Sequence, residues 1–135
     1  MANRIRVTDA QFAILQQLWL HGAQTIRQVM APLYPTQTKS DYATVQKLLE
    51  QLKEKGCVQL DRSKTPHVFS AAIERGDLID AQLKEMADRL CDGSLTPLLM
   101  HLVADARLSK HDRATLRRLL DEAKQRKKTP GGLDP

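Results

Sequence analysis

Residues 40–70, SDYATVQKLLEQLKEKGCVQLDRSKTPHVFS, decide the fold because a helical pattern gives way to an alternating one within them. Ser40 or Asp41 can cap a helix. The residues after them repeat at the spacing of one buried helical face: Val45, Leu48, Leu49 and Leu52. Lys55 followed by Gly56 is typical of a helix end, because a cation suits the last turn and glycine accepts the backbone beyond it. The first half of this stretch therefore predicts a helix that ends at Lys55.

The second half of the stretch predicts a β-hairpin. Residues 57–62 and 67–70 alternate between apolar and polar side chains, and the turn at 63–66 is charged and contains a proline. Alternate residues of a strand point to opposite faces. We expect Phe69 to point away from the inward-facing residues, which are Val58, Leu60 and Val68.

Two shorter helical patterns precede this stretch. Thr8 and Gln11 have the spacing of a capping box, and an apolar stripe follows them: Phe12, Leu15, Leu18 and Trp19. The next helix begins after Gln24 or Thr25 and runs to about Leu33, burying Ile26, Val29 and Met30. Three helices followed by a hairpin are the order of a winged helix-turn-helix.

The remainder of the chain is helical almost to its end. Helical patterns run from Ile73 to about Leu90, from Thr96 through Val103, and from Ser109 onwards. We therefore predict a mainly α protein in which a winged helix-turn-helix precedes a three-helix dimerisation region. The expected divisions are a DNA-binding domain at 1–72, the dimerisation domain at 73–128 and a disordered tail at 129–135.

The leucines of the second half favour pairing of two chains. A region of about 60 residues cannot easily bury so many alone, and residues 95–103 are apolar nearly all round, as in an enclosed element. In a two-fold dimer each copy covers the other, whereas packing of this segment against its own first half is the alternative. The expected interface residues are Leu83, Met86, Leu90, Leu98, Leu99, Leu102, Leu116, Leu119 and Leu120.

Basic charge is concentrated in the first half of the chain. The whole chain has 21 Lys plus Arg against 16 Asp plus Glu, and residues 1–72 hold nine of the basic and five of the acidic groups. This balance favours a polyanionic partner, although ordinary solubilising charge gives the same count. No apolar run reaches the roughly 18 to 20 residues that cross a bilayer. Two cysteines cannot form a disulfide framework, so a reduced cytoplasm is the expected compartment.

The helix predicted after Ser40 is suited to the major groove of DNA. Only that groove, about 12 Å wide, admits an α-helix. Small or polar side chains occupy the first turns: Tyr42, Ala43, Thr44, Gln46 and Lys47. Gln46 can pair with adenine, Lys47 can reach guanine or phosphate, and Thr44 can meet a base edge, a phosphate or a thymine methyl.

Arg62 and Lys64, at the tip of the predicted hairpin, are suited to phosphate contacts. Each of these features has a plainer interpretation. Polar residues at a helix start also serve capping and solvation, and a lysine is an ordinary turn residue. The same topology occurs in modules that bind protein.

Two segments resemble the penicillinase-repressor (BlaI/MecI-type) family. Residues 44–58, TVQKLLEQLKEKGCV, are similar to its reading helix and first wing strand, and residues 7–19, VTDAQFAILQQLW, to its first helix. The similarity extends through 98–109 and covers roughly residues 6–122. It implies a homodimeric bacterial repressor that reads an inverted-repeat operator in double-stranded DNA. The implied DNA contacts are Ala43, Thr44, Gln46, Lys47, Arg62 and Lys64.

Several positions depart from the family pattern. Gln46 and Lys47 stand where relatives often carry arginine or threonine, so a different operator sequence is expected. His101-Leu102 occupies the position of an Asn-Phe bond that is cleaved in some relatives. Cys91 is alone in the half where copper-responsive relatives carry paired Cys-x-Cys motifs. The resemblance therefore supports neither release by that cleavage nor a metal switch, and it leaves any sensor or protease partner unidentified.

Catalytic patterns are missing from the sequence. The four histidines and two cysteines lack His-x3-His or Cys-x2-Cys spacing, and no Gly-rich phosphate loop occurs. We therefore expect no enzymatic activity, no cofactor and no metal site. The predicted function is a cytoplasmic, homodimeric DNA-binding repressor, and the alternative is a dimeric winged-helix adaptor that binds protein and no operator.

Overall fold

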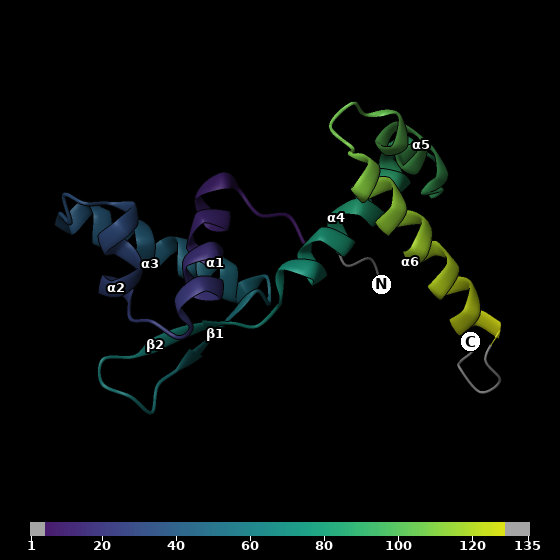
Figure 1. Ribbon diagram of the computed structural model, residues 1–135. Coiled ribbons are helices and arrows are strands. Elements are labelled where there is room, and N and C mark those ends of the chain that lie inside the picture. Colours follow the sequence, from purple (N-terminus) through teal and green to yellow (C-terminus); the bar gives the residue numbers. More distant parts are fainter. Residues whose placement is uncertain (1–4, 129–135) are drawn as a thin grey trace. The chain divides into compact units, whose positions relative to one another are not determined.

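The computed structural model describes residues 5–128, which form six helices and one antiparallel hairpin (Figure 1). The elements are α1 (Asp9–His21), α2 (Ile26–Leu33), α3 (Lys39–Glu54), β1 (Val58–Asp61), β2 (Val68–Ala71), α4 (Arg75–Leu90), α5 (Thr96–Ala104) and α6 (Lys110–Lys128). This order confirms the predicted fold class, a mainly α chain with a winged helix-turn-helix followed by three helices. The predicted tail at 129–135 lies outside the described residues.

The chain divides into two compact units, and the division falls between Glu85 and Met86, inside α4. The first unit holds α1, α2, α3, the hairpin and most of α4, and the second holds the end of α4 with α5 and α6. The domain boundary expected after residue 72 lies ahead of this division, at the end of the hairpin, and the domains stay a prediction.

Threonine caps begin the first two helices. The Oγ1 of Thr8 accepts a hydrogen bond from the backbone N–H of Gln11 (3.1 Å), whose side chain accepts one from the N–H of Thr8 (3.0 Å). Thr25 makes the same exchange with Gln28 at the start of α2. Each pair satisfies two backbone donors that a helix start would leave without partners. The predicted capping box of α1 is confirmed.

The start of α3 differs from the sequence prediction. The cap is Thr38, whose Oγ1 accepts from the N–H of Asp41 (3.0 Å), while the carboxylate of Asp41 accepts from the N–H of Thr38 (3.0 Å). The prediction of Ser40 or Asp41 as the cap was wrong, because an aspartate can take the third position of a capping box and thereby moves the start to Lys39. Hydrogen bonds from Thr36 and then Thr38 lower the pKa of Asp41, because they stabilise the charged carboxylate.

The first unit has one closed apolar core. Fully buried side chains come from all three of its first helices and from the hairpin, and they are joined by Leu78 of α4. Leucine, isoleucine and valine of this kind stabilise a fold by about 1.5 to 3 kcal/mol each when they leave water. The helical members of this core are Ile14, Leu15, Leu18, Val29, Met30, Val45, Leu49 and Leu52, and the hairpin adds Cys57, Val58 and Phe69.

The hairpin corrects one predicted orientation. Phe69 is buried, with 5% of its surface exposed, while Val68 is only half-buried. In the antiparallel register Leu60 lies opposite Phe69 and Asp61 opposite Val68. Directly opposite residues share a face, so an inward Leu60 requires an inward Phe69. The sequence pattern alone did not contain this register.

Aromatic contacts attach the beginning of α4 to α1. The indole N–H of Trp19 donates to the carbonyl of Ile73 (2.9 Å). The guanidinium of Arg75 lies 4.8 Å from the centroid of the Trp19 ring and 5.8 Å from that of Phe12. Such cation–π contacts attract the charge to the faces of the rings. The side chain of Arg6 also pairs with Glu85 further along α4.

The second unit is open by comparison. Among its described residues Ala87 is the only buried hydrophobic side chain, and no residue of α5 is buried. α5 begins at Thr96, as the helical pattern predicts, with Leu95 in the cap position and no side-chain cap. α6 starts as predicted, because Ser109 and Asp112 exchange hydrogen bonds of 3.0 and 3.1 Å.

Candidate nucleic-acid interface

α3 presents most of the predicted reading residues to solvent. Ala43, Thr44, Gln46 and Lys47 are exposed, while Val45 between them is fully buried. The alternation follows from the helical period, because a helix packed along one stripe leaves the intervening positions outside. The structure therefore brings these four side chains together on one helix.

Neighbouring residues constrain two of the predicted readers. The hydroxyl of Thr44 donates to the carbonyl of Ser40 (2.9 Å), which leaves its methyl group and the acceptor capacity of its oxygen for a ligand. Tyr42 is half-buried, and the guanidinium of Arg27 from α2 lies 5.6 Å from the centroid of its ring. The ring of Tyr42 therefore packs against Arg27, and its hydroxyl remains as a polar group for a ligand.

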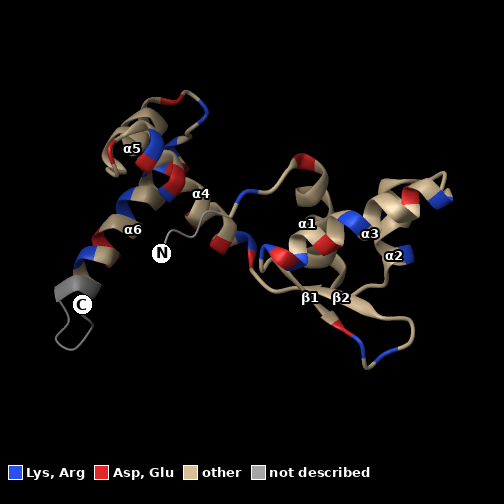
Figure 2. Ribbon diagram, turned by 180° about the vertical axis from the view of Figure 1, so that it is seen from behind, with Lys and Arg blue, Asp and Glu red and all other residues tan. Residues whose placement is uncertain are grey.

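The predicted phosphate contacts lie between β1 and β2. Arg62 and Lys64 are both exposed in this loop. The carboxylate of Asp61 accepts hydrogen bonds from the hydroxyl (2.6 Å) and backbone N–H (2.9 Å) of Ser63. These bonds lower the pKa of Asp61 and hold the charge within the turn. Figure 2 shows basic residues along α3 and in this loop.

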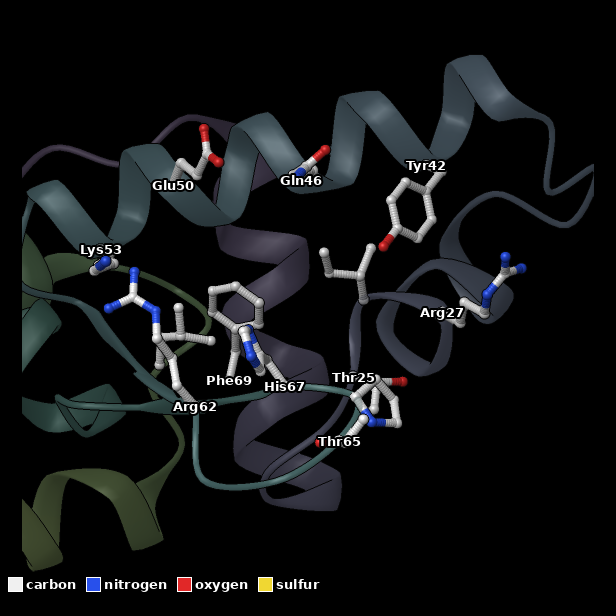
Figure 3. A pocket seen from close by; sticks show the side chains of 13 residues that line it. Thr25, Arg27, Tyr42, Gln46, Glu50, Lys53, Arg62, Thr65, His67 and Phe69 are labelled. Carbon is white, nitrogen blue, oxygen red and sulfur yellow. The ribbon is translucent and has the colours of Figure 1, made fainter.

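A hollow of about 470 Å³ separates α3 from the hairpin (Figure 3). We call it the α3–hairpin hollow. Its apolar floor contains Ile26, Leu60 and Phe69, and polar side chains form its rim. Three predicted DNA-binding residues line it, namely Tyr42, Gln46 and Arg62, and the other four predicted residues do not.

Sequence reasoning missed three basic residues of this hollow, Arg27, Lys53 and His67. Lys53 follows Gln46 by seven residues, which is two helical turns, so the period of α3 alone indicates that they share a face. Arg27 and His67 carry no such signal, because only tertiary packing brings the start of α2 and the hairpin loop to α3.

The predicted dimerisation residues are all at least partly exposed in the single chain. Leu83, Met86 and Leu90 are exposed on α4 at the spacing of one helical face. Leu98, Leu99 and Leu116 are half-buried, while Leu102, Leu119 and Leu120 are exposed. Their role in pairing stays a prediction.

Within residues 5–128, no group of three or more His, Cys, Asp or Glu side chains is arranged to hold a metal ion. No helix in the described part of the chain combines the length and apolar character needed to span a membrane. Burial raises the pKa of the Cys57 thiol, which opposes formation of a thiolate.

Comparison with known proteins adds three findings. The model of the family described as penicillinase repressor matches residues 7–122. The penicillinase repressor of Bacillus licheniformis is 25% identical over 123 residues, covering 91% of this chain and 95% of that protein. A solved structure concerning the regulation of DNA binding of Bordetella bronchiseptica BpsR by 6-hydroxynicotinic acid has a TM-score of 0.42 and 21% identity, covering 89% of this chain and 76% of the other.

Proposed function

Because the chain belongs to the penicillinase repressor family, whose members are regulators and not enzymes, we propose that it represses transcription by occupying an inverted-repeat operator as a homodimer in the cytoplasm. The observation that carries the operator contact is the exposed polar surface on the first turns of α3. A protein bound to the operator through α3 would obstruct the promoter without any chemical step.

The reading surface contains three complementary groups. Gln46 offers a donor and an acceptor that match adenine, and Lys47 offers a cation for guanine or phosphate. Thr44 already donates its proton to Ser40, so its methyl group is the better contact and favours thymine. Together these side chains define a short sequence preference for each half-site.

A partly buried polar network supports the orientation of α3. The side chain of Gln11, only 3% exposed, donates to the side chain of Gln51 (2.8 Å) and accepts from the ammonium of Lys55 (2.7 Å). Gln11 belongs to α1, whereas Gln51 lies in the last turn of α3 and Lys55 caps the end of that helix. This network stabilises the end of α3 that lies away from the reading residues, and a fixed helix makes groove contacts specific.

The open second unit supports the proposed dimer. Leu102, Leu119 and Leu120 are each about half exposed in the single chain. Leucines in a two-fold interface gain the cover that one copy does not supply. Pairing also joins two reading helices, so that the second half-site binds at a high effective concentration.

Binding to selected and random duplexes over a salt series tests this proposal. Selection from random DNA identifies a preferred sequence, and fluorescence anisotropy gives the affinity for it and for an unrelated duplex. We expect an inverted repeat, and we expect affinity for both duplexes to fall steeply with salt because phosphate contacts release counterions. Failure to saturate any duplex, with no dependence on salt, would favour the protein-binding adaptor.

A further inference from the structure

The α3–hairpin hollow collects positive charge from three separate elements. Arg27 comes from α2, Lys53 from α3 and Arg62 from the hairpin loop, which also adds the imidazole of His67 to the lining. Glu50 is the single carboxylate among the residues that line it. Figure 3 shows Arg62 and His67 on the side of the hollow facing α3 and Arg27 beside Tyr42. The sum is a concave basic surface next to Gln46.

The three permanent cations of the hollow have no ion-pair partner among the described residues. Among residues 5–128, the ion pairs involve other arginines and lysines, and Arg27, Lys53 and Arg62 take part in none of them. The guanidinium of Arg27 instead lies 5.6 Å from the centroid of the Tyr42 ring. Stacking on a ring restrains a guanidinium while leaving its N–H groups in the plane free to donate.

Neutral donors accompany the cations. Thr25, Tyr42 and Thr65 add hydroxyl groups to the same lining. The Oγ1 of Thr25 accepts from the N–H of Gln28 (3.2 Å), so its own proton is still available. Hydroxyl, guanidinium and ammonium donors are the groups that bind phosphate and sugar oxygens in protein–DNA complexes.

We propose that the α3–hairpin hollow seats one sugar–phosphate strand of the bound duplex and that Arg27 is a direct phosphate contact. This inference rests on the proposed function and adds to it the side of α3 along which a strand passes. One strand presents a charge about every 3.4 Å along the duplex. Such a row of charges matches cations spread over three elements better than one small anion does.

The carboxylate of Glu50 gives the proposal a test of opposite sign. A negative charge beside a phosphate strand repels it, so Glu50 weakens binding of every duplex in which the strand occupies the hollow. Removal of this charge is therefore expected to strengthen binding to selected and random DNA alike. If the hollow does not receive a strand, Glu50→Gln has no such effect.

The experiment compares full-length Arg27→Ala, Arg27→Lys and Glu50→Gln with Arg113→Ala as a charge-matched control on α6. We expect Arg27→Ala to weaken binding about tenfold on both duplexes and to reduce the salt slope by about 0.9. Arg27→Lys is expected to retain the slope, because it keeps the charge. Glu50→Gln is expected to tighten binding about threefold, and Arg113→Ala to match the unmodified protein.

A neutral methylphosphonate placed at successive linkages of the selected duplex locates the contact. Substitution at one linkage is expected to weaken binding by the unmodified protein. The same substitution is expected to have no further effect on binding by Arg27→Ala, since the shared contact is already gone. Thermal unfolding of each variant separates loss of contact from loss of fold. If Arg27→Ala does not fold, Glu50→Gln still tests the proposal, because it removes a charge of opposite sign from the same lining.

The failures of the two proposals are distinguishable. Normal binding by both Arg27→Ala and Glu50→Gln, with weakened binding by Lys64→Ala, which lies in the hairpin loop but does not line the hollow, overturns the hollow as a strand seat and leaves the repressor function intact. Loss by Arg27→Ala on the selected duplex alone also overturns it, because a phosphate contact does not depend on sequence. Absence of DNA binding by the unmodified protein overturns both.

Discussion

The two units of this chain use leucine in different ways. In the first unit, Leu15, Leu49 and Leu52 are wholly buried among side chains of the same unit. In the second, Leu102 and Leu120 are each 53% exposed. Leucine content therefore predicts an apolar surface, but it does not determine whether the same chain covers that surface.

Their polar surfaces differ as well. Among residues 5–128, the exposed basic residues of α3 and the hairpin loop form no ion pairs, and those of the first unit involve Arg6 and Lys84 elsewhere. The second unit pairs Arg107 with Asp105 and Arg118 with Glu122. Unpaired cations suit a polyanion, and paired ones suit an ordinary solvated surface. The unpaired cations of the first unit therefore fit the proposed DNA-binding role, and the ion pairs of the second unit are those of an ordinary solvated surface.

The largest expected effect comes from placing a negative charge on the exposed leucines of the second unit. Leu102→Asp places a carboxylate at the proposed interface, so we expect sedimentation equilibrium to show monomers where the unmodified protein is a dimer. Operator affinity should fall about 10²- to 10⁴-fold, because the effective concentration of the second reading helix is lost. Leu20→Asp is the matched control, since Leu20 is 73% exposed on α1 and outside the predicted interface. Equal assembly of both variants contradicts the interface.

Truncating the closed core is expected to have the next largest effect. Leu49→Ala leaves a cavity beneath α3 and should lower the free energy of unfolding by about 2 to 5 kcal/mol in a urea titration. Leu20→Ala removes the same atoms from an exposed position and should cost less than about 0.5 kcal/mol. Similar losses from both substitutions would show that burial in the single chain does not decide stability.

A smaller effect is expected at the reading surface. Lys47→Ala should weaken binding to the selected duplex by about 1 to 3 kcal/mol, and binding to random DNA by less, because a base contact carries sequence information. Lys110→Ala, at the start of α6, is the control with the same change of charge. Anisotropy titrations on both duplexes measure the difference, and equal losses would identify Lys47 as a phosphate contact.

The smallest expected effect distinguishes two carboxylates, one in each unit. Hydrogen bonds from Thr36 and Thr38 lower the pKa of Asp41, and hydrogen bonds from Arg107 lower that of Asp105. A depressed folded pKa adds stability above the ordinary value of 3.8, and this contribution is lost as the pH falls through the folded value. Salt at about 1 M should raise the pKa of Asp105, because it screens the arginine charge, and should leave the pKa of Asp41 nearly unchanged. NMR titration of the two carboxyl groups at low and high salt measures the difference.

Helical features were the part of the fold that the sequence predicted best. Val45, Leu49 and Leu52 recur over several turns, so their shared face is determined many times over. A strand of four residues provides too few repeats to choose between its two faces, which is why Phe69 was placed on the wrong one. The cap of α3 was misplaced because Thr36, Thr38, Ser40 and Asp41 are all residue types that cap helices.

The candidate site was only partly predictable. Gln46 and Lys47 follow from the helical period, because exposed positions on a helix are fixed by the buried ones. Arg27 and His67 join the same hollow through tertiary packing, and the bridge between Gln24 and β2 is part of what brings the start of α2 to the hairpin. Spacing along the chain does not indicate which distant residues pack together in this way.

The indole of Trp19 in α1 contacts Ile73 and Arg75 at the start of α4, so its fluorescence reports on the contact between these two helices. It is the only tryptophan in the chain, so all of the intrinsic indole emission comes from this one joint. Separation of α4 from α1 would remove the Ile73 carbonyl and the Arg75 guanidinium and expose the ring to water. A red shift of the emission maximum would therefore record that event, with no label attached.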